Sequence, residues 1–103
     1  MVLKAIELTV GADSDSDAAY EWYERQEQGA GRYFDRQLLH LLENIRMRPF
    51  SFPTSHAVFR KALMRKFPYA VYFQIFDEKI VVIAIIHGAR NPRRVRDLLR
   101  REF

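Results

Sequence analysis

The side chains best suited to chemistry are basic, aromatic and imidazole groups in the second half of the chain. They are Arg60, Lys61, Arg65, Lys66, Tyr69, His87 and Arg90. The first four lie on one predicted strand, the tyrosine follows in the next turn, and the last two come at the end of a later apolar strand. Arginine binds phosphate through two parallel hydrogen bonds, and histidine titrates near neutral pH. Brought together, these groups could hold a phosphodiester and transfer protons.

Each of these candidates also has a structural interpretation. Lysines such as Lys61 and Lys66 can face solvent on a strand and protect a sheet edge from pairing. His87 stands where a buried strand ends, a position that also suits a hydrogen-bonded structural histidine. The arginines near the C-terminus, which include Arg93 and Arg94, fit either a solvated helix face or a binding surface.

The sequence gives little support for a metal site, a thiol or serine nucleophile, or a phosphate-binding loop. The chain has no cysteine, which excludes disulfides, thiolate zinc sites and thiol nucleophiles and fits a reducing cytoplasm. His40, His56 and His87 are far apart in sequence and lack metal-site spacing. Glycine-rich phosphate loops and Gly-x-Ser-x-Gly motifs are also missing. We therefore expect no metal and no cofactor, and a cytoplasmic location.

The first half of the chain predicts a strand followed by a helical hairpin. Residues 2–10 are rich in β-forming side chains, and residues 11–17 read as a turn with capping-box spacing. A helix should then run to about residue 28. After the Gly-Ala-Gly break at 29–31, a second helix is expected from about 32 to 47. The expected core residues of this hairpin are Trp22, Phe34, Leu38, Leu41, Leu42 and Ile45.

The second half predicts a sheet and a final helix. Strands are expected at 58–66, 70–76 and 80–86, and the last of these is apolar on both faces, as in a central strand. Asn91-Pro92 has the pattern of a helix start. The order is β-α-α-β-β-β with a C-terminal helix, an α+β fold in which helices cover one face of a small, largely antiparallel sheet.

Length and charge limit the function further. With 103 residues the chain has room for a single domain, residues 1–103. Its longest apolar run, residues 80–86, is far shorter than the roughly 18 residues of a membrane span, so we expect no membrane partner. Residues 1–45 carry four basic against nine acidic residues, whereas residues 46–103 carry 13 against four, net charges of −5 and +9. The basic half predicts a polyanionic or acidic partner.

Several short motifs follow one another along nearly the whole chain. They are Ala19-Tyr-Glu-Trp-Tyr-Glu24, Gly29-x-Gly31-x-x-Phe34, Arg60-Lys-Ala-Leu63, Arg65-Lys-Phe-Pro-Tyr-Ala-Val-Tyr-Phe73 and His87-Gly-Ala-Arg-Asn-Pro92. In this combination the chain resembles the RelE/ParE toxin superfamily, which includes plasmid-stabilisation proteins. The resemblance implies a growth-inhibiting toxin of a type II toxin–antitoxin system. It also implies a cognate antitoxin whose C-terminal segment folds as it wraps the toxin, and an acidic segment would match the +9 half.

Two functional classes share this fold. ParE-like members inhibit DNA gyrase by binding it, whereas RelE-like members cut messenger RNA at the ribosome, where the 2′-hydroxyl attacks the adjacent phosphate. As a ribonuclease, the chain would use His87, Arg65, Tyr69 and Arg90 as its catalytic groups. Instead of the His-Tyr or lone Tyr that some nucleases carry after the last strand, it has Gly88-Ala89.

A C-terminal helix is also predicted where some nucleases end soon after the strand. These departures favour a ParE-like, non-catalytic toxin, and the alternative is a RelE-like ribosome-dependent endoribonuclease. In the ParE-like case the residues expected to bind the target or the antitoxin are Arg60, Lys61, Lys66, Arg93 and Arg94.

Overall fold

A computed structural model describes residues 3–88 and 92–100 of the chain. Its elements are β1 (Ala5–Leu8), α1 (Val10–Gln26), α2 (Ala30–Met47), the short 3-10 helix η1 (Pro49–Ser51), β2 (Thr54–His56), β3 (Phe59–Leu63), β4 (Tyr69–Ile75), β5 (Lys79–His87) and α3 (Pro92–Arg100). The predicted α+β order is confirmed. The short strand β2 is an addition, because the segment after the second helix pairs with β3 instead of forming only a loop.

The strands form a sheet in the order β1-β5-β4-β3-β2. Strand β1 is parallel to β5, and the other neighbours are antiparallel. The apolar strand β5 is thus flanked by β1 and β4, and every residue from Ile80 to Ile86 is buried. This confirms the prediction of a central strand that is apolar on both faces.

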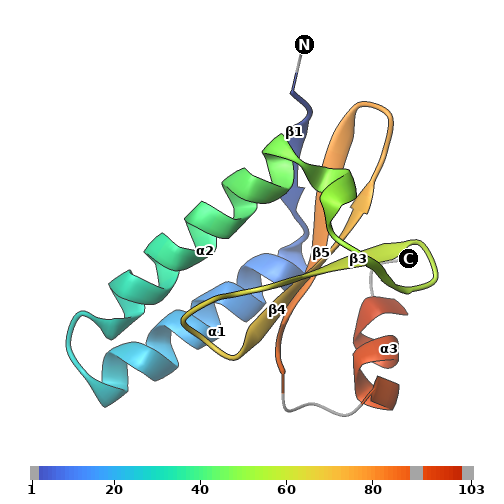
Figure 1. Cartoon of the computed structure of the whole chain (residues 1–103). Coiled ribbons are helices and arrows are strands. Elements are labelled where there is room, and N and C mark those ends of the chain that lie inside the picture. The colour runs from blue at the N-terminus through green and yellow to red at the C-terminus, as the bar shows by residue number, and fades with distance from the viewer. Residues whose placement is uncertain (1–2, 89–91, 101–103) are drawn as a thin grey trace.

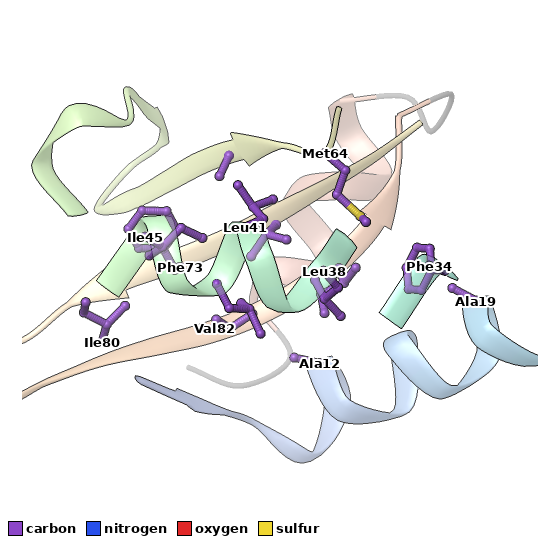
Figure 2. Close-up of a cluster of buried hydrophobic side chains, with 14 residues drawn as sticks. Ala12, Ala19, Phe34, Leu38, Leu41, Ile45, Met64, Phe73, Ile80 and Val82 are labelled. Carbon is purple, nitrogen blue, oxygen red and sulfur yellow. The ribbon is translucent and has the colours of Figure 1, made fainter. Parts of the chain in front are cut away.

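Helices cover both faces of the sheet (Figure 1). The hairpin of α1 and α2 packs on one face, where Phe34, Leu38 and Ile45 meet the inward side chains of β4 and β5 (Figure 2). On the opposite face, Val95 and Leu99 of α3 join a second core cluster. The expectation that all helices lie on one face is therefore wrong. The reason is that α3 has an apolar stripe of its own, and the face of β4 and β5 that points away from α1 and α2 is also apolar.

Helix α1 begins earlier than predicted. The Thr9 hydroxyl accepts a hydrogen bond from the backbone N–H of Ala12 (3.1 Å), so the helix starts at Val10. Ser14 and Asp17, expected to cap the helix, lie inside it. The cap falls on Thr9, the residue that directly follows β1, and its backbone N–H still donates to the Val82 carbonyl oxygen of β5 (3.0 Å).

Trp22 is half exposed rather than a core residue. The buried side of α1 consists of the small residues Ala12, Ser16 and Ala19. The two helices approach closely at Gly31, where an added Cβ would stand 2.7 Å from the Tyr20 carbonyl oxygen. The larger ring that enters the core from α1 is Tyr23, which stacks on Phe34 at 5.6 Å between centroids.

A bulge in β5 determines which face its last residues occupy. Tyr72 pairs with Ala84 and Phe73 pairs with Val82, so Ile83 is an extra residue in the ladder. Ile83 and Ala84 therefore both belong to the cluster beneath α3, and the residues that follow change sides. Without the bulge, strict alternation would place His87 on the α3 face. With it, His87 lies on the face covered by α1 and α2.

Candidate functional site

Tyr69 and His87 lie side by side at the end of the sheet. They are directly paired across β4 and β5, and their rings meet edge to face with centroids 5.2 Å apart. Both line a hollow of about 240 Å³ between the sheet and helix α1. The other residues lining this hollow are Asp15, Ala18, Ala19, Trp22 and Ile85. The structure thus brings together two of the four residues predicted for catalysis.

Asp15 adds a carboxylate to this hollow that sequence reasoning missed. Its Oδ2 accepts a hydrogen bond from the backbone N–H of Ile85 (2.9 Å). This bond fastens α1 to β5 just after the bulge. In sequence, Asp15 looks like any acidic residue in the first turns of a helix, and only the bulge turns the Ile85 N–H toward it.

Several aromatic side chains pack together beside Tyr69. Tyr69 contacts Phe34 and Tyr23 with centroid separations of 5.3 and 6.2 Å, and Phe67 contacts Tyr23 at 4.7 Å. Burial raises the pKa of Tyr23 above its ordinary value, and the neighbouring Tyr69 raises it further. Tyr23 therefore stays a neutral phenol, and its ring packs against the core.

Arg65 lines a different hollow. It lies in the turn between β3 and β4 and faces polar residues of α2 across a space of about 150 Å³. The other residues lining that space are Gln37, His40, Leu41, Asn44 and Leu63. The two hollows share no lining residue, so Arg65 is not placed with Tyr69 and His87. Arg90, the fourth predicted catalytic residue, lies outside the described residues.

Among the residues predicted for target or antitoxin binding, Arg60 and Lys61 point to opposite faces of the sheet. Arg60 points to the face of the sheet covered by α1 and α2, where it donates a hydrogen bond to the Phe52 carbonyl oxygen (2.6 Å). Lys61 points the other way, with its Nζ 5.9 Å from the centroid of the Tyr72 ring. Lys66 is exposed in the turn that follows β3, and Arg93 is exposed on α3. The side chain of Arg94 lies outside the described residues.

A cluster that sequence reasoning missed lies where α2 ends. Met47 and Phe50 are 54% and 67% exposed, and the cationic side chains of Lys4, Arg46, Arg48 and Arg60 lie nearby. We call these six residues the Phe50 patch. The signal was present in the alternation of basic and apolar residues from Arg46 to Phe50, which a prediction of secondary structure treats only as a helix end.

Two negative findings concern the described residues. Within residues 3–88 and 92–100, His, Asp and Glu side chains do not gather in groups of three that could hold a metal ion. In the same part of the chain, no helix has the length and apolar character needed to cross a membrane.

Comparisons with known proteins agree with this fold. The sequence matches the family described as "ParE toxin of type II toxin-antitoxin system, parDE" over residues 6–92. Among solved structures, the chain is similar to one described as the chromosomal ParDE TA system from P. aeruginosa, with a TM-score of 0.74 and 15% sequence identity. That similarity covers 82% of this chain and 96% of the other. No curated protein matches the sequence. The family match spans most of the chain, including all buried residues of the core between the helical hairpin and the sheet, and on this basis the chain belongs to the ParE toxin family within the RelE/ParE superfamily.

Proposed function

We propose that this type II toxin is neutralised by a cognate antitoxin and, when free in the cytoplasm, inhibits DNA gyrase by binding it without catalysis. The observation that carries the proposal is the family match over residues 6–92. The related ParDE structure, which contains a toxin–antitoxin system by its description, supports an antitoxin partner.

The arrangement of the candidate residues supports binding rather than RNA cleavage. Cleavage through the 2′-hydroxyl needs a base, an acid and a cation around one phosphate. His87 and Tyr69 share a hollow, but Arg65 lines another one over α2. In the proposed toxin, the basic residues Arg60, Lys61, Lys66, Arg93 and Arg94 serve as contacts to gyrase or the antitoxin.

A ribosome-dependent endoribonuclease is the second candidate. One observation favours it: Asp15, Tyr69 and His87 line the same hollow, so carboxylate, phenol and imidazole groups are available together. Arg90 would supply the missing cation in this case.

Induced expression with pulse labelling of DNA and protein synthesis distinguishes the two candidates. For the gyrase inhibitor we expect a slow arrest with DNA damage, and the purified protein should inhibit gyrase supercoiling. The variants His87→Ala and Arg65→Ala should keep this inhibition, as should His56→Ala, a control for loss of an imidazole elsewhere. A rapid stop in protein synthesis that His87→Ala abolishes and His56→Ala leaves intact would overturn the proposal in favour of RNA cleavage. Circular dichroism confirms that each variant is folded.

A further inference from the structure

The end of α2 exposes more apolar surface than a purely structural helix end needs. Met47 and Phe50 are both more than half exposed. Below them lie two adjoining hollows of about 460 and 450 Å³, which share Met47, Arg48 and Ser51 as lining residues. Exposed apolar side chains around a concavity are typical of a surface that another molecule covers.

The surroundings of this apolar centre are strongly cationic. Lys4, Arg46, Arg48 and Arg60 belong to the patch, and the acidic side chain found to neutralise one of them is Glu43, 3.3 Å from Arg46. Within the described part of the chain, Arg48 makes no ion pair. The patch therefore has an excess of positive charge beside an apolar hollow, and its complement is a segment that is both acidic and apolar.

The cations nearest Phe50 are held in place by the backbone. Lys4 Nζ donates to the Phe76 carbonyl oxygen (2.8 Å) and lies 5.9 Å from the centroid of the Phe50 ring. The Arg60 guanidinium, bound to the Phe52 carbonyl oxygen, lies 5.2 Å from the same centroid. Both cations are pre-organised, which reduces the entropy lost when they pair with a carboxylate.

The same geometry favours a peptide over a nucleic acid. A single-stranded nucleic acid needs an open aromatic face for base stacking and a basic groove that follows the backbone. Here Lys4 and Arg60 already lie near the Phe50 ring, and the larger hollow is lined mainly by apolar groups and aliphatic stems. A bulky apolar side chain can enter the hollow while flanking carboxylates reach Arg48 and its neighbours.

We propose that the Phe50 patch is the docking site for an acidic segment of the antitoxin that inserts an apolar anchor beside Met47 and Phe50. This proposal rests on the proposed function, because it takes the antitoxin as the partner. It adds the location and the chemistry of one contact: an apolar residue flanked by aspartate or glutamate.

The test uses the full chain and the purified product of the adjacent antitoxin gene, with the dissociation constant measured by isothermal titration calorimetry at low and moderate salt. Phe50→Ser and Arg48→Glu should each weaken binding by about tenfold or more, as expected for central contacts of an interface. The Arg48→Glu complex should also depend less on salt. Two changes of the same kind within α2, at the exposed residues Leu39 and Arg36, serve as matched controls: Leu39→Ser and Arg36→Glu should leave the affinity within about threefold.

The outcomes separate this proposal from the one on which it rests. If wild type binds and the patch variants bind equally well, the docking site is wrong while the toxin–antitoxin assignment stands. If the folded wild type does not bind the adjacent gene product at all, the antitoxin assignment fails and the docking site fails with it. If the patch variants lose binding only to a labelled oligothymidine, the patch serves nucleic acid and the peptide proposal is overturned.

Discussion

The two ends of the helical hairpin differ in how far their side chains take part in intramolecular contacts. The closed end is the turn between α1 and α2, and the open end is where α2 ends. At the closed end, the Glu24 carboxylate accepts hydrogen bonds from the backbone N–H groups of Gly29 (2.9 Å) and Gly31 (3.0 Å). At the open end, Met47 and Phe50 remain exposed among cations. One end joins two helices, and the other presents surface to a partner. Substitutions should therefore affect folding at the closed end and binding at the open end.

The largest effect on folding is expected at Gly31. Gly31→Ala places a methyl group 2.7 Å from the backbone carbonyl oxygen of Tyr20, which can move only if α1 and α2 separate. We expect the free energy of unfolding to fall by about 1–3 kcal/mol, measured by urea denaturation. Gly29→Asn is the control, because Gly29 has φ +91° and open space around it, and asparagine tolerates the left-handed region. Equal stability of wild type and Gly31→Ala would contradict the close approach.

A smaller effect is expected for Glu24→Gln, and it should depend on pH. Hydrogen bonds from Gly29 and then Gly31 hold the pKa of the Glu24 carboxyl below its ordinary value. The charged form thus stabilises the fold above the unfolded-state pKa of about 4.3. This contribution is lost as the pH falls through the lower folded-state pKa. Glu24→Gln should be less stable than wild type at pH 7, and the difference should shrink in acid.

Urea denaturation at a series of pH values measures this effect. Glu27→Gln removes a carboxylate from the same turn, three residues along, and should follow the wild-type profile. A Glu24→Gln profile parallel to wild type at every pH would show that the carboxylate does not cap the turn.

The smallest effect on folding is expected at the open end. Phe50→Ser removes an exposed ring and two cation–aromatic contacts, so the free energy of unfolding should change by less than about 1 kcal/mol. Thermal unfolding by circular dichroism checks this. A loss as large as that of Gly31→Ala would mean that the ring belongs to the core, and the contrast between the two ends would disappear.

Regular periodicity made much of the fold predictable. The stripe of Phe34, Leu38 and Ile45 is visible at helical spacing, and all three side chains are buried. The apolar run of β5 likewise indicated a central strand with two apolar faces. The predictions that failed concern which side chains are buried where two elements pack together. Trp22 was expected in the core because it is large and apolar, but the side of α1 that enters the core runs through Ala19 and Tyr23 and leaves Trp22 half exposed.

The candidate site was only partly predictable for a similar reason. Tyr69 and His87 were both named from sequence, yet their contact depends on the extra residue at Ile83, which no periodic pattern reveals. Arg65 was grouped with them because it is near Tyr69 in sequence. The turn after β3 instead carries it over α2, where it lines another hollow.

The hydrogen bond from Ile85 to Asp15 has a further consequence for solubility. Strand β1 pairs with β5 only as far as Val82, so the last part of this very apolar strand runs beyond its parallel neighbour. Such an exposed strand edge can recruit strands from other molecules and start aggregation. Here the Asp15 carboxylate occupies the Ile85 amide, and the Thr9 hydroxyl donates to the Ile83 carbonyl oxygen (3.2 Å). Two side chains thus bind backbone groups along the edge that β1 leaves uncovered, and we expect this to make pairing with a strand of another molecule less favourable there.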